Sequence, residues 1–161
     1  MHSRHSIALA LVALFSLSSC QYAEDRYLRR EVRAAELLGR WQVTDYGLRS
    51  LAAVGHRLHL SKAEHMLFFA ADGTCNFQSF VDPTREGSLP TQVYLPVPVP
   101  CRWVLSSAPP RQQLTLSVEA TSSSPAFVQS YSFDEEDGHL IIWQHVTDPD
   151  AWKYLEFVRL P

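Results

Sequence analysis

The stretch Leu114–Glu119, LTLSVE, alternates apolar and polar side chains without a break. Its even-numbered residues are apolar and its odd-numbered residues are polar. Successive side chains of a β-strand point to opposite faces of the sheet, so this pattern gives one buried face and one wet face. The stretch therefore predicts a strand of an antiparallel sheet, and the rest of the chain is interpreted from it.

Seven further short runs, rich in β-branched and aromatic residues, predict strands on both sides of this one. With Leu114–Glu119, the expected strands are Trp41–Tyr46, His65–Ala70, Thr74–Phe80, Cys101–Leu105, Val128–Phe133, Leu140–His145 and Tyr154–Arg159. Asp-Gly pairs at Asp72-Gly73 and Asp137-Gly138 indicate two tight hairpins. About eight strands in sequence order favour a mainly β fold, a single up-and-down antiparallel β-barrel, with a sandwich as the alternative.

The start of this region, Leu38-Gly39-Arg40-Trp41, resembles the Gly-x-Trp opening of the lipocalin and wider calycin barrels. The resemblance covers residues 36–161 and implies an eight-stranded barrel preceded by a short helix. In that family the tryptophan closes one barrel end by packing against an arginine from the last strand region. Trp41 and Arg159 are the matching residues. The Thr-Asp-Tyr motif expected midway in classical lipocalins is absent there, so the ligand specificity of the family is not carried over.

Residues 1–19 have the layout of a secretory signal peptide, with Arg4 before an apolar run, Ile7–Leu17. That run is shorter than the roughly 20 residues that a membrane-spanning helix needs. Its end, Leu17-Ser18-Ser19-Cys20, resembles the bacterial lipobox, which implies that Cys20 becomes the acylated first residue of the mature chain, carrying palmitate-type chains. The membrane is then a partner through these N-terminal acyl chains, which together exceed the two-anchor requirement for stable attachment.

Gln21 follows the cysteine where lipoproteins retained in the inner membrane often carry aspartate. By resemblance, this favours anchoring in the outer membrane with the domain facing the periplasm, and the inner membrane and the cell surface stay open. Helical spacing of Leu28, Val32 and Ala35 predicts a helical tether over 20–38. The expected organisation is thus a signal peptide, 1–19, a tether, 20–38, and a barrel domain, 39–161.

The chain contains three cysteines. If Cys20 is consumed by lipid, Cys75 and Cys101 remain as an even pair in an oxidising compartment, and we expect them to form a disulfide. A redox or metal role is the alternative, but the Cys-x-x-Cys spacing is absent.

The segment Leu89–Cys101, LPTQVYLPVPVPC, carries prolines at 96, 98 and 100, which donate no backbone hydrogen bond. It is predicted to be an extended arm and not a central strand. As a lid or recognition surface it would offer Tyr94 to a ligand or partner. As an edge-protecting loop it would only block aggregation.

No motif for catalysis or metal binding emerges. If the chain is extended there, His56 and His59 point to opposite faces, no Gly-x-Ser-x-Gly elbow is present, and the acidic clusters lie in predicted turns. We therefore expect no enzyme, no metal and no cofactor. A net charge of −3 without a basic patch argues against nucleic acid as a partner.

These observations favour a non-catalytic binding module for a small apolar or amphipathic ligand. The residues proposed to contact the ligand or a partner are Phe68, Phe77, Tyr94, Trp103 and Trp143. The alternative is a protein–protein interaction factor of the cell envelope, an inhibitor or an assembly accessory, acting through its surface or the arm 89–101. An eight-stranded barrel is just wide enough either to fill itself with side chains or to hold one small ligand.

Overall fold

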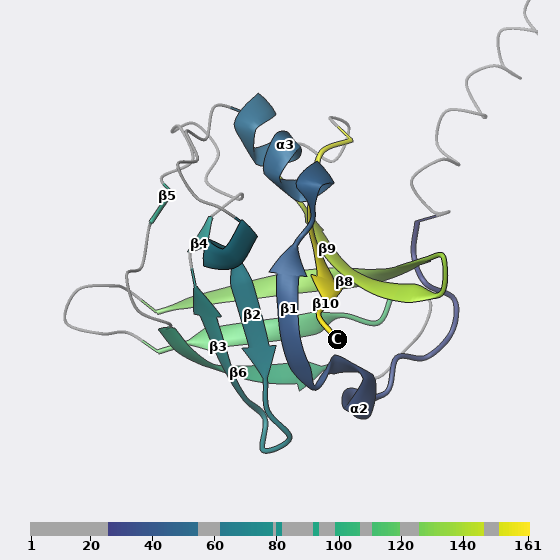
Figure 1. Cartoon of the computed structure of the whole chain (residues 1–161). Helices are drawn as coiled ribbons and strands as arrows, with labels where there is room; N and C mark the ends of the chain where they lie inside the picture. The colour runs from purple at the N-terminus through teal and green to yellow at the C-terminus, as the bar shows by residue number, and fades with distance from the viewer. Residues whose placement is uncertain are drawn as a thin grey trace, which may run out of the picture.

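The computed structural model describes residues 26–54, 62–78, 80–81, 92–93, 99–106, 111–119, 126–146 and 152–161. Eight strands close into one barrel in which all neighbours are antiparallel, in the order β1-β10-β9-β8-β7-β6-β3-β2 (Figure 1). The strands are β1 (Gly39–Val43), β2 (Met66–Phe69), β3 (Thr74–Gln78), β6 (Val99–Leu105), β7 (Leu114–Val118), β8 (Phe127–Glu136), β9 (His139–His145) and β10 (Tyr154–Arg159). The predicted eight-stranded antiparallel barrel is confirmed.

Both predicted Asp-Gly hairpins are present, between β2 and β3 and between β8 and β9. Gly73 and Gly138 adopt φ angles of 80° and 76°, which glycine reaches without steric cost. The Asp72 carboxylate accepts the backbone N–H of Thr74 at 2.9 Å and its hydroxyl at 2.6 Å. Local sequence therefore sets the register of these two hairpins.

The proline-rich arm is in part a strand, which corrects the expectation. Pro100 lies within β6, opposite Asn76 of β3, and β6 has barrel neighbours on both sides. The backbone N–H of Trp103 donates to the Gly73 carbonyl, on the β3 side. Backbone N–H groups alternate in direction along a strand, so the nitrogen of Pro100 points to the other side, toward β7. The β6–β7 ladder runs from Arg102 with Ser117 to Leu105 with Leu114, so Pro100 lies outside it and its missing N–H interrupts no bond of that ladder. In the chain, a separate two-stranded sheet of β4 (Phe80–Val81) and β5 (Gln92–Val93) comes between β3 and β6, which pair directly with each other in the barrel.

The expected strand Trp41–Tyr46 ends at Val43, and a helix that the sequence did not suggest follows it, α3 (Asp45–Ala53). The Thr44 hydroxyl accepts the Gly47 N–H at 2.9 Å and thereby caps this helix. Gly47 lets the helix lie directly on β10, because a Cβ there would stand 2.9 Å from the Glu156 nitrogen. A single 3-10 turn, η1 (Lys62–Glu64), precedes β2.

The helix expected over Gln21–Leu38 is present, within the described residues, only as α2 (Ala34–Leu37). Tertiary hydrogen bonds replace the intrahelical ones. The Leu28 N–H donates to the Phe133 carbonyl at 2.9 Å. The side chain of Gln112 accepts the Val32 N–H at 2.7 Å and donates to the Val32 carbonyl at 3.0 Å. Residues 26–33 are therefore held along the barrel without helix, and we call residues 26–38 the N-terminal segment.

Inward side chains of all eight strands form one contiguous hydrophobic cluster. The N-terminal segment adds Val32 and Leu37 to it, and α3 adds Leu51, each 1% exposed or less. Figure 1 shows α2 at one end of β1 and α3 at its other end. Cys75 and Cys101 face each other from β3 and β6 within this cluster and form a disulfide, as expected.

Replacing both cysteines, Cys75→Val and Cys101→Val, should destabilise the fold. Their positions are 26 residues apart, and the chain-entropy model assigns a loop of that length about 3.5 kcal/mol. We expect the free energy of unfolding to fall by about this amount, measured by urea denaturation followed by circular dichroism. The Cys20→Ser variant is the control and should unfold like the wild type. An unchanged urea midpoint in the double variant would contradict the prediction.

Candidate functional site

Phe68, one of the predicted contact residues, lies on the outside of the barrel and is 42% exposed. Its register partners are Arg40 on β1 and Asn76 on β3, and Asn76 pairs in turn with Pro100 on β6. All four residues are exposed. They form a row across four neighbouring strands, with one aromatic ring among polar side chains.

Two surface hollows flank Asn76 on this side of the barrel, and Asn76 lines both. The one around Phe68, on β1, β2 and β3, measures about 500 Å³, and the one on β3, β6 and β7 measures about 490 Å³. We call the outward-facing residues that line them the outer β-face. These are Arg40, Gln42, Met66, Phe68, Thr74, Asn76, Gln78, Pro100, Arg102, Ser117 and Glu119. Strands that are distant in the sequence thus contribute to one mixed polar and apolar surface.

Phe77 and Trp103, two other predicted contact residues, lie in the barrel core. Phe77 is 4% exposed and packs edge-on against Phe127, with ring centroids 5.7 Å apart. Trp103 packs against Phe69, and its indole N–H donates to the Ala70 carbonyl at 3.0 Å. Both rings contact other protein groups on the inside, so the structure gives them a packing role.

The interior also holds polar side chains that the sequence analysis did not single out. Gln129 is 8% exposed and its amide oxygen accepts the hydroxyl of Tyr131 at 2.8 Å. Burial raises the pKa of Tyr131 well above its ordinary value. Gln144 on β9 is 7% exposed, and its side-chain NH₂ has no hydrogen-bond partner among the described residues. The only sequence signal for these residues was that each polar side chain occupies a position that the alternation of its strand places inside the barrel.

Trp143 lies on the outer side of β9, yet it is only 2% exposed. It belongs to a second cluster with Ile141 and Tyr154, against which Tyr27 packs. The ring of Tyr27 lies 5.4 Å from that of Trp143, and the ring of Tyr154 lies 5.0 Å from it. The N-terminal segment therefore covers the outer side of β9 and β10 at this point.

Arg26 is the centre of this second cluster. Its guanidinium lies 3.9 Å from the Tyr154 ring centroid and 5.1 Å from that of Trp143. It donates to the Glu156 carboxylate and forms an ion pair with Asp134 at 3.4 Å. Glu156 is 7% exposed, so Arg26 compensates a buried negative charge. Sequence reasoning missed this site, although a glutamate flanked by Leu155 and Phe157 was a possible signal.

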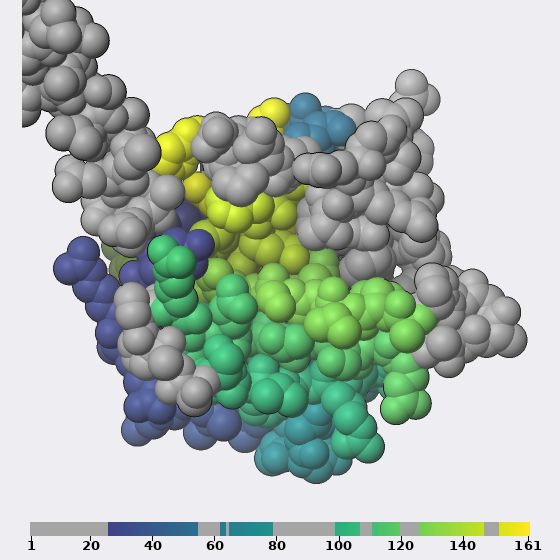
Figure 2. Space-filling view, turned by 180° about the vertical axis from the view of Figure 1, so that it is seen from behind, coloured from purple at the N-terminus to yellow at the C-terminus, as the bar shows by residue number. Residues whose placement is uncertain are grey.

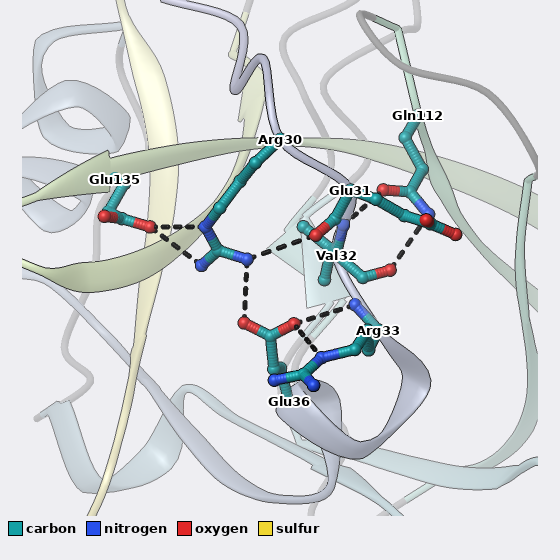
Figure 3. A network of polar contacts seen from close by, with 7 residues as sticks. All are labelled: Arg30, Glu31, Val32, Arg33, Glu36, Gln112 and Glu135. Carbon is teal, nitrogen blue, oxygen red and sulfur yellow. Dashed lines mark hydrogen bonds and ion pairs between the residues drawn. The ribbon is translucent and has the colours of Figure 1, made fainter.

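A polar network fastens the next part of the N-terminal segment (Figure 3). Arg30 forms ion pairs with Glu135 on β8 at 2.7 Å and with Glu36 at 2.8 Å. Burial alone would raise the pKa of Glu36, but hydrogen bonds from the Arg33 backbone and from Arg30 hold it below its usual value. The side chain of Gln112 holds the intervening Val32 by accepting its backbone N–H and donating to its carbonyl. The segment is thus bound to the barrel along most of its length.

Trp41 and Arg159 stand opposite each other in the register of β1 and β10. Trp41 is fully buried, and its indole N–H donates to the Leu37 carbonyl of α2 at 2.8 Å. Arg159 lies over Gly39, where a Cβ would stand 3.5 Å from its Nε atom. Gly39 has a φ of 113°, so any other residue would be strained there. The pair lies at the α2 end of the barrel.

Cys20 and Tyr94 lie outside the described residues. Within the part of the chain that the structure describes, no three His, Cys, Asp or Glu side chains come close enough to hold a metal ion together. No helix in that part is long and apolar enough to cross a membrane.

Comparisons of this chain with protein families, curated proteins and solved structures find no match.

The Arg26→Ala substitution should destabilise the protein, because it leaves the Glu156 carboxylate buried without its cation. We expect a loss of about 2–3 kcal/mol in the free energy of unfolding, measured by urea denaturation. This lies below the roughly 3–5 kcal/mol of a fully buried pair, since the Arg26 side chain is 22% exposed.

Arg49→Ala, which removes an exposed arginine from α3, is the matched control and should change stability by no more than about 0.5 kcal/mol. The pair Arg26→Met with Glu156→Gln should recover part of the loss, because no charge then stays buried alone. Equal stability of the Arg26→Ala and Arg49→Ala variants would show that the cluster contributes nothing.

Proposed function

We propose that this chain is a non-catalytic binding protein of the bacterial cell envelope. Acyl chains on Cys20 anchor it in the outer membrane with the barrel facing the periplasm. Its outer β-face binds a protein partner, with the ring of Phe68 at the centre of the contact. The observation that carries this proposal is the contrast between the two sides of the sheet: inward side chains pack into one cluster, whereas the outer β-face is hollowed around an exposed ring.

The composition of the outer β-face supports a protein as partner. Interfaces are enriched in aromatic side chains, methionine and arginine, and this surface offers Phe68, Met66 and Arg40 side by side with neutral amides. Arg102 and Glu119 give the second hollow both charge signs. Such a mixture fits the polar rim and aromatic centre of a moderate protein–protein contact.

A small apolar or amphipathic ligand is the second candidate. The buried Gln144 favours it, because its side-chain NH₂ lacks a partner among the described residues. Buried amides normally find a partner, and a polar group of a ligand in the barrel would provide one.

The anchor predicts metabolic labelling at one cysteine. Cells that express the full chain with an alkyne fatty acid should yield labelled protein in the outer-membrane fraction. Cys20→Ser should abolish the label completely, because Cys75 and Cys101 are joined in the disulfide. In-gel fluorescence measures both results, and label that survives Cys20→Ser would overturn the anchor.

The protein partner predicts one dominant photo-cross-link from position 68. A photoreactive amino acid in place of Phe68 should give one adduct band in living cells. The matched control is Val128 on β8, which is 67% exposed and lies on the strand opposite β2 in the ring, and it should give no such band. Identical patterns from the two positions would contradict a specific role for the outer β-face.

Extraction of the purified chain separates the two candidates. A stoichiometric organic compound in its mass spectrum, reduced by Gln144→Leu and unaffected by Phe68→Ser, would support the small ligand and contradict the protein partner. An adduct at position 68 without such a compound would support the protein partner.

A further inference from the structure

The N-terminal segment limits how far the barrel can stand from the membrane. Arg26 is fixed to the outer side of β8, β9 and β10 through Asp134, Trp143, Tyr154 and Glu156. Only five residues, 21–25, separate it from Cys20. An extended chain gains at most about 3.3–3.6 Å per residue, so Arg26 lies within roughly 20 Å of the acylated cysteine.

Two exposed aromatic residues stand close to this attachment. Tyr154, which contacts Arg26, stacks on Tyr46 of α3 with a centroid separation of 6.5 Å. The hydroxyl of Tyr46 donates to the carbonyl of Trp152 at 2.8 Å. Tyr46 is 37% exposed and Trp152 is 49% exposed. Trp152 is therefore two aromatic residues away from the point where the tether meets the barrel.

Trp152 is held in an unusual conformation. Its φ of 52° is in the left-handed region, which is rare for a bulky residue and costs of order 1–3 kcal/mol. The hydrogen bond from Tyr46 helps to fix the residue there. Figure 2 shows α3, in blue, and the start of the C-terminal strand, in yellow, along one edge of the molecule. A half-exposed indole is thus held beside Tyr46 of α3 at an energetic cost.

We propose that this edge, with Trp152 and Tyr46, lies against the headgroup layer of the membrane that carries Cys20. Tryptophan and tyrosine are enriched at membrane–water interfaces, where the ring meets the acyl boundary and the polar tip stays hydrated. The tether, at most roughly 20 Å long, keeps Arg26 and therefore the nearby edge close to the bilayer. The inference rests on the proposed acylation of Cys20, and it assigns the bilayer itself as the partner of this edge.

Depth-dependent fluorescence quenching tests the proposal with the full, acylated chain. The protein is reconstituted in vesicles of phosphatidylethanolamine and phosphatidylglycerol that contain lipids brominated near the headgroup. Trp41, Trp103 and Trp143 are 9% exposed or less, so Trp152 is the exposed fluorophore. We expect the bromolipid to quench part of the emission of the wild type and to quench Trp152→Phe far less.

A second variant keeps the test independent of the fold around residue 152. Phe68→Trp in the Trp152→Phe background places an indole on the outer β-face, and its emission should stay unquenched. Equal quenching of the wild type and Trp152→Phe, in protein whose mass shows the acyl chains, would overturn the membrane contact and leave the anchor intact. A mass without acyl chains on Cys20 would overturn the anchor and, with it, this inference.

Discussion

Strand β1 closes the ring, because its residues 39–42 pair with β2 on one side and its residues 41–43 pair with β10 on the other. β10 lies at the far end of the chain, so this closure brings together segments of large sequence separation and costs the most loop entropy. Without it, two strand edges would be open to other chains. The ends of β1 are therefore defined closely. The strand starts at Gly39, whose positive φ only glycine adopts without strain. It ends before Thr44, whose hydroxyl caps the helix that follows.

The two outer sides of the barrel differ in what they contact. The N-terminal segment covers the outside of β9 and β10, where an arginine, a glutamate and several aromatic rings satisfy one another. The outside of β1, β2, β3, β6 and β7 carries two hollows and the exposed Phe68. The outside of β9 and β10 thus binds the N-terminal segment of the same chain, whereas the outer β-face stays exposed for contacts with other molecules.

The sequence predicted most of the barrel, because its strands alternate and its hairpins carry Asp-Gly turns. It placed β10 without error and the disulfide pair correctly. It missed α3, which the hydroxyl of Thr44 caps. It extended α2, because Gln112, far along the chain, binds the Val32 backbone in place of helical hydrogen bonds. Of the predicted contact residues, only Phe68 is exposed among those the structure describes. Alternation gives the face of a residue within one strand, but it does not show which outer faces another segment covers.

The attachment of Arg26 also determines how mechanical load enters the fold. Force from the N-terminal side reaches β8 and β10 first, through Asp134 and Glu156, because these bonds precede the rest of the N-terminal segment. Arg30 and Val32 then pass the remainder to Glu135 and Gln112. β1, which would otherwise be peeled from its first residue, is reached last. The segment therefore transfers force to other strands before that force can reach β1, the strand that closes the barrel.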